Sequence, residues 1–228
     1  VHKAAQCRRD TSRYSSPTPE LTVFSADVLK RFDLNGPRYT SYPTADRFTP
    51  VFGREDYARA LRTMAHRPAS LYVHVPFCRS LCYYCACNKI ISKSATVADE
   101  YLELLARETA LVTSQTGVMP IAQLAFGGGT PNFLTVAQLG RLMADLDSKF
   151  ELLPDREQGI ELDPRYLDAD YIAALPALGF NRVSYGVQDF DQQVQTLIHR
   201  FQSFEQTAQA VEAARAVGIN SISFDLVY

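Results

Sequence analysis

The chain has 228 residues, of which 46% are hydrophobic and 21% are charged, and its formal net charge at pH 7 is −2. These values are typical of a globular domain, and they exclude a fibre, a disordered tail and a general nucleic-acid binder. No apolar run approaches the roughly 18 residues that a membrane-spanning helix needs, and the N-terminal segment has no hydrophobic signal core. We therefore expect a soluble, cytoplasmic protein that binds neither nucleic acid nor membranes.

The first third of the chain lacks a regular pattern. Residues 1–20 are polar and rich in Ser, Thr and Pro, which predicts a disordered leader. Residues 21–67 are predicted to form an N-terminal arm with short helices. The clearer helix lies in REDYARALRTMAH (54–66), where apolar side chains recur at helical spacing. Before it, the irregular stretch NGPRYTSYPTADRF (35–48) offers polar groups that could contact a ligand.

From residue 68 onward, strand and helix patterns alternate. This alternation predicts βαβ units, a parallel sheet and an α/β fold. Thr135 and Gln138 are predicted to form a capping box at the start of one helix. The expected strands are 71–75, 121–129, 159–164, 182–190 and 221–228. The expected helices are 97–114, one following Thr135, one from about 168, 191–199 and 203–217.

Polar and special residues follow the predicted strands at the points where they end. Ligand sites of parallel α/β folds lie at the carboxyl ends of the strands, so these residues are expected to meet in one site. They are Cys78 and the residues after it, 127–130, Glu161, Asp163, Gln188, Asp189 and Asp225.

Four of the five cysteines lie in HVPFCRSLCYYCACNK, with the spacing C-x3-C-x2-C-x-C. They are Cys78, Cys82, Cys85 and Cys87. Disulfides are not expected in a cytosolic chain, and such close spacing indicates a metal site. A short loop with three thiolates can hold one corner of an iron–sulfur cubane and leave one iron open. A zinc loop that uses all four cysteines is the alternative.

The C-x3-C-x2-C segment after a first strand resembles the signature of radical S-adenosylmethionine (SAM) enzymes. The longer series RYTSYPT, LYVHVPFC, CYYCACNK, FGGGTP, IELDP and GVQDF is similar to the family of oxygen-independent coproporphyrinogen III oxidases. The resemblance covers about residues 28–228, and its motifs occur in the order of the family.

This resemblance implies an oxidoreductase of porphyrin and haem biosynthesis, built on a partial (β/α) radical SAM barrel over residues 68–228. Cys78, Cys82 and Cys85 would hold a [4Fe–4S] cluster whose open iron binds SAM. A 5′-deoxyadenosyl radical would then drive decarboxylation of two propionates of coproporphyrinogen III to vinyl groups, giving protoporphyrinogen IX. The expected partners are this substrate and an unidentified electron donor, and the chain is expected to be a monomer.

The resemblance also assigns SAM-binding residues, and it implies two SAM molecules. Gly128, Gly129 and Thr130 would grip the SAM amino group, where glycines let the backbone approach and supply free N–H donors. The remaining residues assigned to the two sites are Tyr72, the backbone around Tyr84, Glu161, Gln188, Arg200 and Asp225, with Asp163 as a support. Each has a structural alternative: a strand tyrosine is more often in the core, and a carboxylate at a strand end often caps a helix.

Several residues keep two interpretations. Cys87 lies either beside the cluster or packed under the loop, and His74 is either a core residue or a neighbour of the cluster. His199 gives no reason to expect a role. The arm residues 38–43 form a family signature, and their contact with the tetracarboxylate substrate is a hypothesis.

The chain stops at Tyr228, directly after the fifth predicted strand. The resemblance implies a further strand and a C-terminal domain, so we expect a truncated product that binds a cluster but turns over poorly or not at all. Two other functions stay open. One is a haem-handling relative that keeps the cluster, which RYTSYP and the C-x-C ending disfavour. The other is a zinc-stabilised structural module.

Overall fold

The computed structural model describes residues 25–32, 44–65, 67–94 and 96–227. The chain divides into two compact units, Val1–Val51 and Phe52–Tyr228. The described part of the first unit holds a helix α1 (Ala26–Phe32) and a 3-10 turn η1 (Ala45–Arg47). The predicted leader, 1–20, and the signature residues 38–43 lie outside the described residues, and the division into leader, arm and barrel stays a prediction.

The second unit alternates strands and helices along the chain. Its first half contains α2 (Arg54–Met64), β1 (Ala69–Val75), β2 (Phe77–Cys78), β3 (Ile90–Ile91), α3 (Thr96–Thr116), β4 (Pro120–Gly128), η2 (Pro131–Phe133) and α4 (Val136–Lys149). Its second half contains β5 (Glu151–Leu162), η3 (Pro164–Tyr166), α5 (Ala169–Ala174), η4 (Pro176–Leu178), β6 (Arg182–Gln188), α6 (Gln192–Ile198), α7 (Phe204–Ala216) and β7 (Ser221–Leu226).

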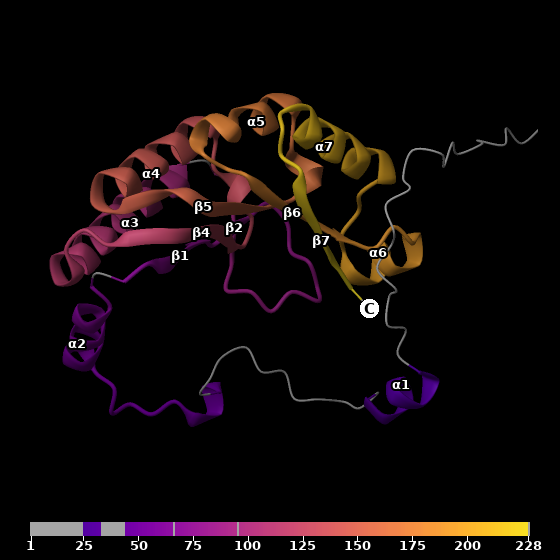
Figure 1. Cartoon of the computed structure of the whole chain (residues 1–228). Helices are drawn as coiled ribbons and strands as arrows, with labels where there is room; N and C mark the ends of the chain where they lie inside the picture. The colour runs from indigo at the N-terminus through magenta and orange to yellow at the C-terminus, as the bar shows by residue number, and fades with distance from the viewer. Residues whose placement is uncertain (1–24, 33–43, 66, 95, 228) are drawn as a thin grey trace, which may run out of the picture. The chain divides into compact units, whose positions relative to one another are not determined.

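The main sheet has the order β1-β4-β5-β6-β7, and every neighbouring pair is parallel. The predicted α/β class, with a parallel sheet of a partial barrel, is confirmed. Helices α3, α4, α5 and α7 lie along one side of this sheet (Figure 1). Strands β2 and β3 form a separate two-stranded sheet that was not predicted, and Cys78 ends β2.

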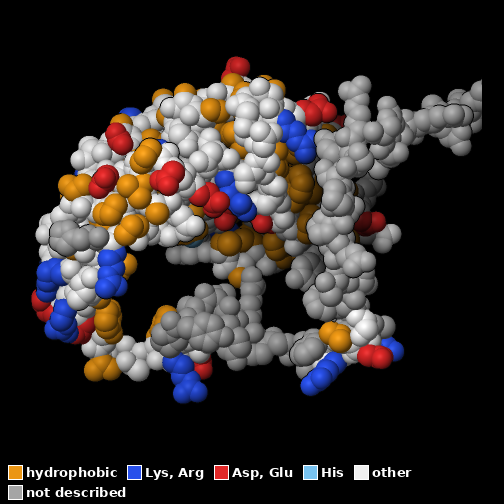
Figure 2. All heavy atoms as spheres, in the orientation of Figure 1, with side chains coloured by type: hydrophobic (Ala, Val, Ile, Leu, Met, Phe, Trp, Pro, Cys, Tyr) orange, Lys and Arg blue, Asp and Glu red, His pale blue; other side chains and the backbone are white. Residues whose placement is uncertain are grey.

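The hydrophobic core lies between this helical layer and the sheet. On α4, Leu139, Leu142 and Leu146 are buried together with Leu124 and Phe126 of β4. The predicted capping box is present: the Thr135 side chain accepts a hydrogen bond from the Gln138 backbone, and the Gln138 side chain accepts one from the Thr135 backbone. The outer surface of the helical layer mixes charged and hydrophobic side chains, as is ordinary for a folded domain (Figure 2).

The start of strand β5 also differs from the sequence-based expectation. Strand β5 begins at Glu151 rather than at 159, because Ile121 pairs with Leu152 while Gln123 pairs with Glu157. Residues 153–156 of β5 lie between these two pairs. They interrupt the alternation of apolar and polar side chains by which a strand is recognised in sequence. Helix α2 lies in the second unit, where it packs against α3. Within the described residues, no helix is both long and apolar enough to cross a membrane.

Candidate functional site

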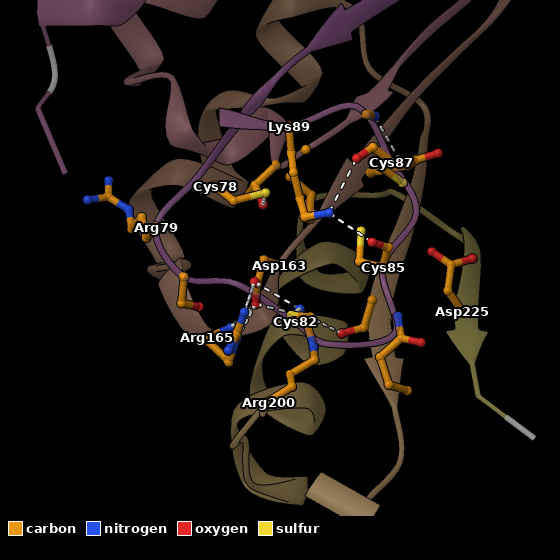
Figure 3. A pocket seen from close by; sticks show the side chains of 18 of the residues that line it. Cys78, Arg79, Cys82, Cys85, Cys87, Lys89, Asp163, Arg165, Arg200 and Asp225 are labelled. Carbon is orange, nitrogen blue, oxygen red and sulfur yellow. Dashed lines mark hydrogen bonds and ion pairs between the residues drawn. The ribbon is translucent and has the colours of Figure 1, made fainter. Parts of the chain in front are cut away.

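The carboxyl ends of the strands and the loop after β2 enclose one cavity (Figure 3). All but one of the sequence-predicted cluster and SAM residues line it: Cys78, Cys82, Tyr84, Cys85, Gly128, Gly129, Thr130, Glu161, Gln188, Arg200 and Asp225. Tyr72 instead lines an adjoining hollow, which shares Glu161 with this cavity. The side chain of Tyr72 is 55% exposed, so the core interpretation of this tyrosine is wrong.

The three predicted cluster cysteines surround the same hollow, and all are free thiols. Thr130 donates a hydrogen bond from its hydroxyl to the Cys78 Sγ at 3.5 Å, and Arg200 Nη1 donates one to the Cys82 Sγ at 3.7 Å. Burial, with smaller contributions from the neighbouring thiols, raises the pKa of Cys78 despite the opposing Thr130 hydrogen bond. A metal centre bound here would therefore displace thiol protons.

Two kinds of metal site use several thiolates. Zinc binds thiolates at about 2.3 Å, so its ligands must converge on one point. In a cubane cluster each thiolate binds its own iron, and soft thiolate ligands suit iron–sulfur chemistry. Cys78, Cys82 and Cys85 line one cavity as free thiols, and this donor set fits a [4Fe–4S] cluster. The zinc loop that uses all four cysteines stays the alternative.

The end of the cysteine loop is held by Lys89. Its Nζ donates to the backbone oxygens of Cys85 at 2.8 Å and Cys87 at 3.4 Å. Cys87 itself is exposed and lines the cavity, so it is not a residue packed under the loop. Burial raises the pKa of the Cys87 thiol, and Lys89 opposes that shift. Sequence reasoning missed Lys89, although it is the first cation after the cysteine motif.

The glycines at the end of β4 allow close packing against β1, β2 and β5. A Cβ atom on Gly128, whose φ is +108°, would lie 2.6 Å from the His74 ring, and one on Gly129 would lie 2.8 Å from backbone atoms of Pro76 and Phe77. We expected free N–H donors here, and that part of the prediction is wrong. Gly128 donates its N–H to Glu161 at 3.3 Å, and Gly129 donates to the Val75 oxygen at 2.8 Å.

Two carboxylates face the cavity from different strands. Burial raises the pKa of Glu161, an effect that the Gly128 hydrogen bond opposes and the nearby Asp225 reinforces. Asp225 accepts a hydrogen bond from the Ser184 hydroxyl at 3.4 Å. Because these carboxylates have no ion-pair partner among the described residues, they are suited to bind an ammonium group or hydroxyl groups of a ligand.

A buried charge cluster forms the floor beside Cys82. Asp163 binds Arg165 at 2.6 Å and Arg200 at 3.1 Å, and the three side chains are between 5% and 11% exposed. Two guanidinium groups face one carboxylate, which leaves one positive charge next to the thiolates. Burial lowers the pKa of Arg165, but the hydrogen bonds that its guanidinium donates to Asp163 and the attraction of that carboxylate outweigh this effect and raise the pKa. Sequence reasoning gave Asp163 only a supporting role and missed Arg165, which follows it by two residues.

Backbone conformation also marks the end of β6. Gln188 has a φ of 68°, in the left-handed region that residues other than glycine seldom adopt, and its carbonyl accepts a hydrogen bond from Val227 at 3.1 Å. Strained backbone of this kind is frequent at functional sites. Arg200 reaches the same strand end, where its Nη2 donates to the Gly186 oxygen at 2.5 Å.

Both histidines near the loop contact its backbone. His74 Nε2 lies 2.8 Å from the Asn88 oxygen, and its Nδ1 lies 3.4 Å from the Tyr72 hydroxyl. Because the carbonyl can only accept, Nε2 carries the proton, and His74 is a neighbour of the loop rather than a core residue. His199 Nδ1 donates to the Leu81 oxygen at 2.8 Å. No sequence signal pointed to His199, since the partner is a backbone atom 118 residues away.

Comparison with known proteins identifies the family to which the chain is similar. The Radical SAM superfamily pattern matches residues 72–228. Oxygen-independent coproporphyrinogen III oxidase from Pseudomonas aeruginosa is 49% identical over 210 residues, which are 90% of this chain and 46% of the relative. The enzyme of the same name from Escherichia coli is 43% identical over 201 residues, which are 88% of this chain and 44% of the relative.

A solved structure gives the same result for the fold. Coproporphyrinogen III oxidase (HemN) from Escherichia coli, described as a radical SAM enzyme, matches with a TM-score of 0.81 and 42% identity, over 88% of this chain and 45% of that one. The chain thus spans about half the length of the curated relatives it matches. With a family match over more than half of its residues and a cavity whose thiols fit a [4Fe–4S] cluster used together with SAM, the chain belongs to the radical SAM superfamily.

Proposed function

We propose that this chain contributes the radical SAM barrel of an oxygen-independent coproporphyrinogen III oxidase. The reaction would be the oxidative decarboxylation of two propionates of coproporphyrinogen III to vinyl groups, giving protoporphyrinogen IX. The observation that carries the proposal is that Cys78, Cys82 and Cys85 line one cavity together with all of the predicted SAM residues except Tyr72. The identity of up to 49% to relatives of that name supports the substrate.

The chain's own residues would bind the cluster and SAM, orient them, and shield them from water. Cys78, Cys82 and Cys85 would hold the cluster, and Lys89 fixes the backbone after Cys85. A bound [4Fe–4S] cluster and SAM would supply the 5′-deoxyadenosyl radical that abstracts hydrogen from each propionate. Each substrate radical would then lose carbon dioxide and pass one electron to an electron acceptor, which leaves the vinyl group. Glu161, desolvated and beside Gly128, would accept hydrogen bonds from the ammonium or hydroxyl groups of SAM. The positive charge left over in the Asp163 cluster would offset the negative charge of the thiolates.

The proposal includes a second SAM molecule, held by Gln188, Arg200 and Asp225. These three side chains come from β6, the segment after α6, and β7, and they line the same cavity as the cysteines. Asp225 is exposed to the cavity and could bind ribose hydroxyls. Arg200 is already bonded to Asp163 and Gly186, so it would bind a second ligand only through the donor capacity that remains.

The remaining partners belong to the same proposal. An electron donor must reduce the cluster, and a cytoplasmic location would keep the cysteines reduced. The monomeric state stays a prediction. The contact of residues 38–43 with the substrate carboxylates also stays a prediction, since those residues lie outside the described part of the chain.

The direct test is anaerobic reconstitution with iron and sulfide, followed by reduction with dithionite in the presence of SAM and coproporphyrinogen III. The proposal predicts that the reconstituted chain releases 5′-deoxyadenosine from SAM. It also predicts that the protein that contains this barrel releases carbon dioxide and forms vinyl products from coproporphyrinogen III. A titration of the chain with haem tests the alternative function. Tight haem binding without decarboxylation would support the haem-handling relative, and zinc without sulfide in the purified chain would refute the cluster.

A further inference from the structure

Two segments far apart in sequence are joined residue by residue beside the cluster cysteines. Ile198, His199 and Arg200, at the end of α6, contact the loop residues Leu81, Cys82 and Tyr83. The Tyr83 N–H donates to the Ile198 oxygen at 3.0 Å, His199 Nδ1 donates to the Leu81 oxygen at 2.8 Å, and Arg200 Nη1 reaches the Cys82 Sγ at 3.7 Å. The two neighbours of Cys82 in the chain, Leu81 and Tyr83, are therefore both hydrogen-bonded to residues at the end of α6.

The ring of His199 makes an additional contact with this loop. It stacks on the ring of Tyr83 with centroids 4.8 Å apart and an interplanar angle of 10°. Tyr83 is 66% exposed, so the stack forms a cover on the outer side of the loop rather than part of the core. Hydrogen bond and ring stack act on the two neighbours of Cys82, which is itself only 8% exposed.

The backbone at His199 is unusual for a residue with a side chain. Its φ is 54°, and the amides of His199 and Arg200 bond to the oxygens of Thr196 at 3.3 Å and Gln195 at 3.0 Å. This is the helix ending in which the left-handed position is most often glycine. A histidine there carries a conformational cost that glycine would avoid, and strain of this kind is retained where the side chain has a task.

From these contacts we propose that His199 is a positioning residue, which holds the loop so that the Cys82 thiol stays buried and directed into the cavity. This inference deepens the proposed function, because Cys82 is one of the three cysteines assigned to the cluster. It concerns the folded chain before any metal is bound, so it can fail or hold independently of the reaction.

The helix ending itself supplies matched variants. His199→Gly keeps the left-handed turn and removes the imidazole. His199→Asn also tolerates that conformation, and its Nδ2 lies as many bonds from the backbone as the histidine Nδ1, so it can donate to the Leu81 oxygen. Leu197→Ala is the control, since Leu197 is 75% exposed on the same helix. Tyr83→Ala removes only the stack and serves as a second variant if His199→Gly does not fold.

The first measurement is the rate at which iodoacetamide alkylates each cysteine in the metal-free 228-residue chain, followed by peptide mass spectrometry. We expect His199→Gly to accelerate the alkylation of Cys82 about five-fold, the factor that one net hydrogen bond represents. Exposed Cys87 should react at its wild-type rate in every variant. His199→Asn should stay within about two-fold of wild type for Cys82, and Leu197→Ala should not differ from it.

The second measurement is the rate at which a chelator removes iron from the reconstituted chain, where His199→Gly should lose iron faster than His199→Asn. Unchanged Cys82 alkylation in His199→Gly would overturn the proposal. Equal acceleration in the Gly and Asn variants, or equal acceleration of Cys87, would also overturn it, because the hydrogen bond to the loop would then not be the cause. A wild-type chain that takes up no iron would refute the proposed function, while the alkylation rates would still decide the role of His199.

Discussion

The packing of α4 on the sheet and the loop after β2 are stabilised in different ways. Helix α4 buries Leu139, Leu142 and Leu146 against apolar side chains of the sheet. The loop of residues 79–89 has little regular structure, and it is held by polar contacts from His74 of β1, from the end of α6 and from Lys89. The difference teaches that the helical layer gives this unit its stability, while the loop depends on a few individual bonds for its geometry.

This contrast has a consequence for substitutions. A change in the core should affect the free energy of unfolding and leave the chemistry of the folded fraction intact. A change in the loop or its polar supports should alter cluster or ligand binding, with an effect on unfolding only where a buried charge loses its partner.

The largest expected effect is on the cluster. Cys85→Ser should reduce the formation of 5′-deoxyadenosine from SAM to background, because one of three cluster thiolates is lost. Cys87→Ser is the matched control, since Cys87 lies two residues away and is not among the three assigned ligands. It should retain the iron and sulfide content of the wild type after anaerobic reconstitution. Equal loss of iron in both variants would show that the assignment of ligands is wrong.

The next largest effect is expected in the buried charge cluster. Asp163→Asn leaves Arg165 and Arg200 buried without a countercharge, which should lower the free energy of unfolding by about 3–5 kcal/mol. Urea denaturation of the metal-free chain measures this change. Glu157→Gln, in β5, the strand that ends just before Asp163, removes a pair with Arg182 at 3.8 Å whose side chains are 56% and 43% exposed. That variant should differ from wild type by less than about 1 kcal/mol, and comparable losses in the two variants would contradict the burial argument.

A core substitution should separate stability from chemistry. Leu146→Ala removes a fully buried side chain of α4 and should lower the free energy of unfolding by about 2–5 kcal/mol. Below the denaturation midpoint, the folded fraction should take up iron and sulfide as the wild type does. Leu111, on α3, is 67% exposed, and its replacement by alanine should change stability by no more than about 0.5 kcal/mol. Loss of the cluster in folded Leu146→Ala would break the contrast between the two regions.

The smallest effect concerns pH. Burial raises the pKa of Glu161 above its ordinary value of 4.5, so the folded chain binds more protons than the unfolded chain between that value and the raised one. The free energy of unfolding should therefore fall as pH rises through this window. Glu161→Gln has no proton to lose, so its unfolding free energy should fall less over the same range in urea titrations of the metal-free chain. An identical pH dependence of the two proteins would contradict the raised pKa.

The helical layer and the parallel alternation of strands and helices were largely predictable from sequence. The Leu139, Leu142 and Leu146 stripe and the Thr135–Gln138 capping box depend on spacing within one helix, which sequence displays directly. The residues at the strand ends were also predictable, because parallel strands bring their carboxyl ends to one edge. The early part of β5 was missed because its pairing with β4 is interrupted after Ile121.

The supports of the site were not predictable in the same way. His199 acts on a backbone oxygen, and Arg200 reaches Cys82 across 118 residues of sequence, so no local pattern records either contact. Arg165 and Lys89 lie close to recognisable motifs, but their roles depend on partners that only the folded chain brings near. The glycines at the end of β4 were assigned to the site partly on the expectation of free N–H donors. The N–H groups of Gly128 and Gly129 are instead bonded within the protein.

The most direct test of the central claim is the electron paramagnetic resonance spectrum of the reduced, reconstituted chain, recorded before and after SAM is added. Three cysteine ligands leave one iron of a [4Fe–4S] cluster open to a ligand. If SAM binds at that iron, the signal of the reduced cluster changes when SAM is added. A cluster signal that SAM leaves unchanged, or a reconstituted chain that gives no cluster signal, would contradict the assignment of Cys78, Cys82 and Cys85.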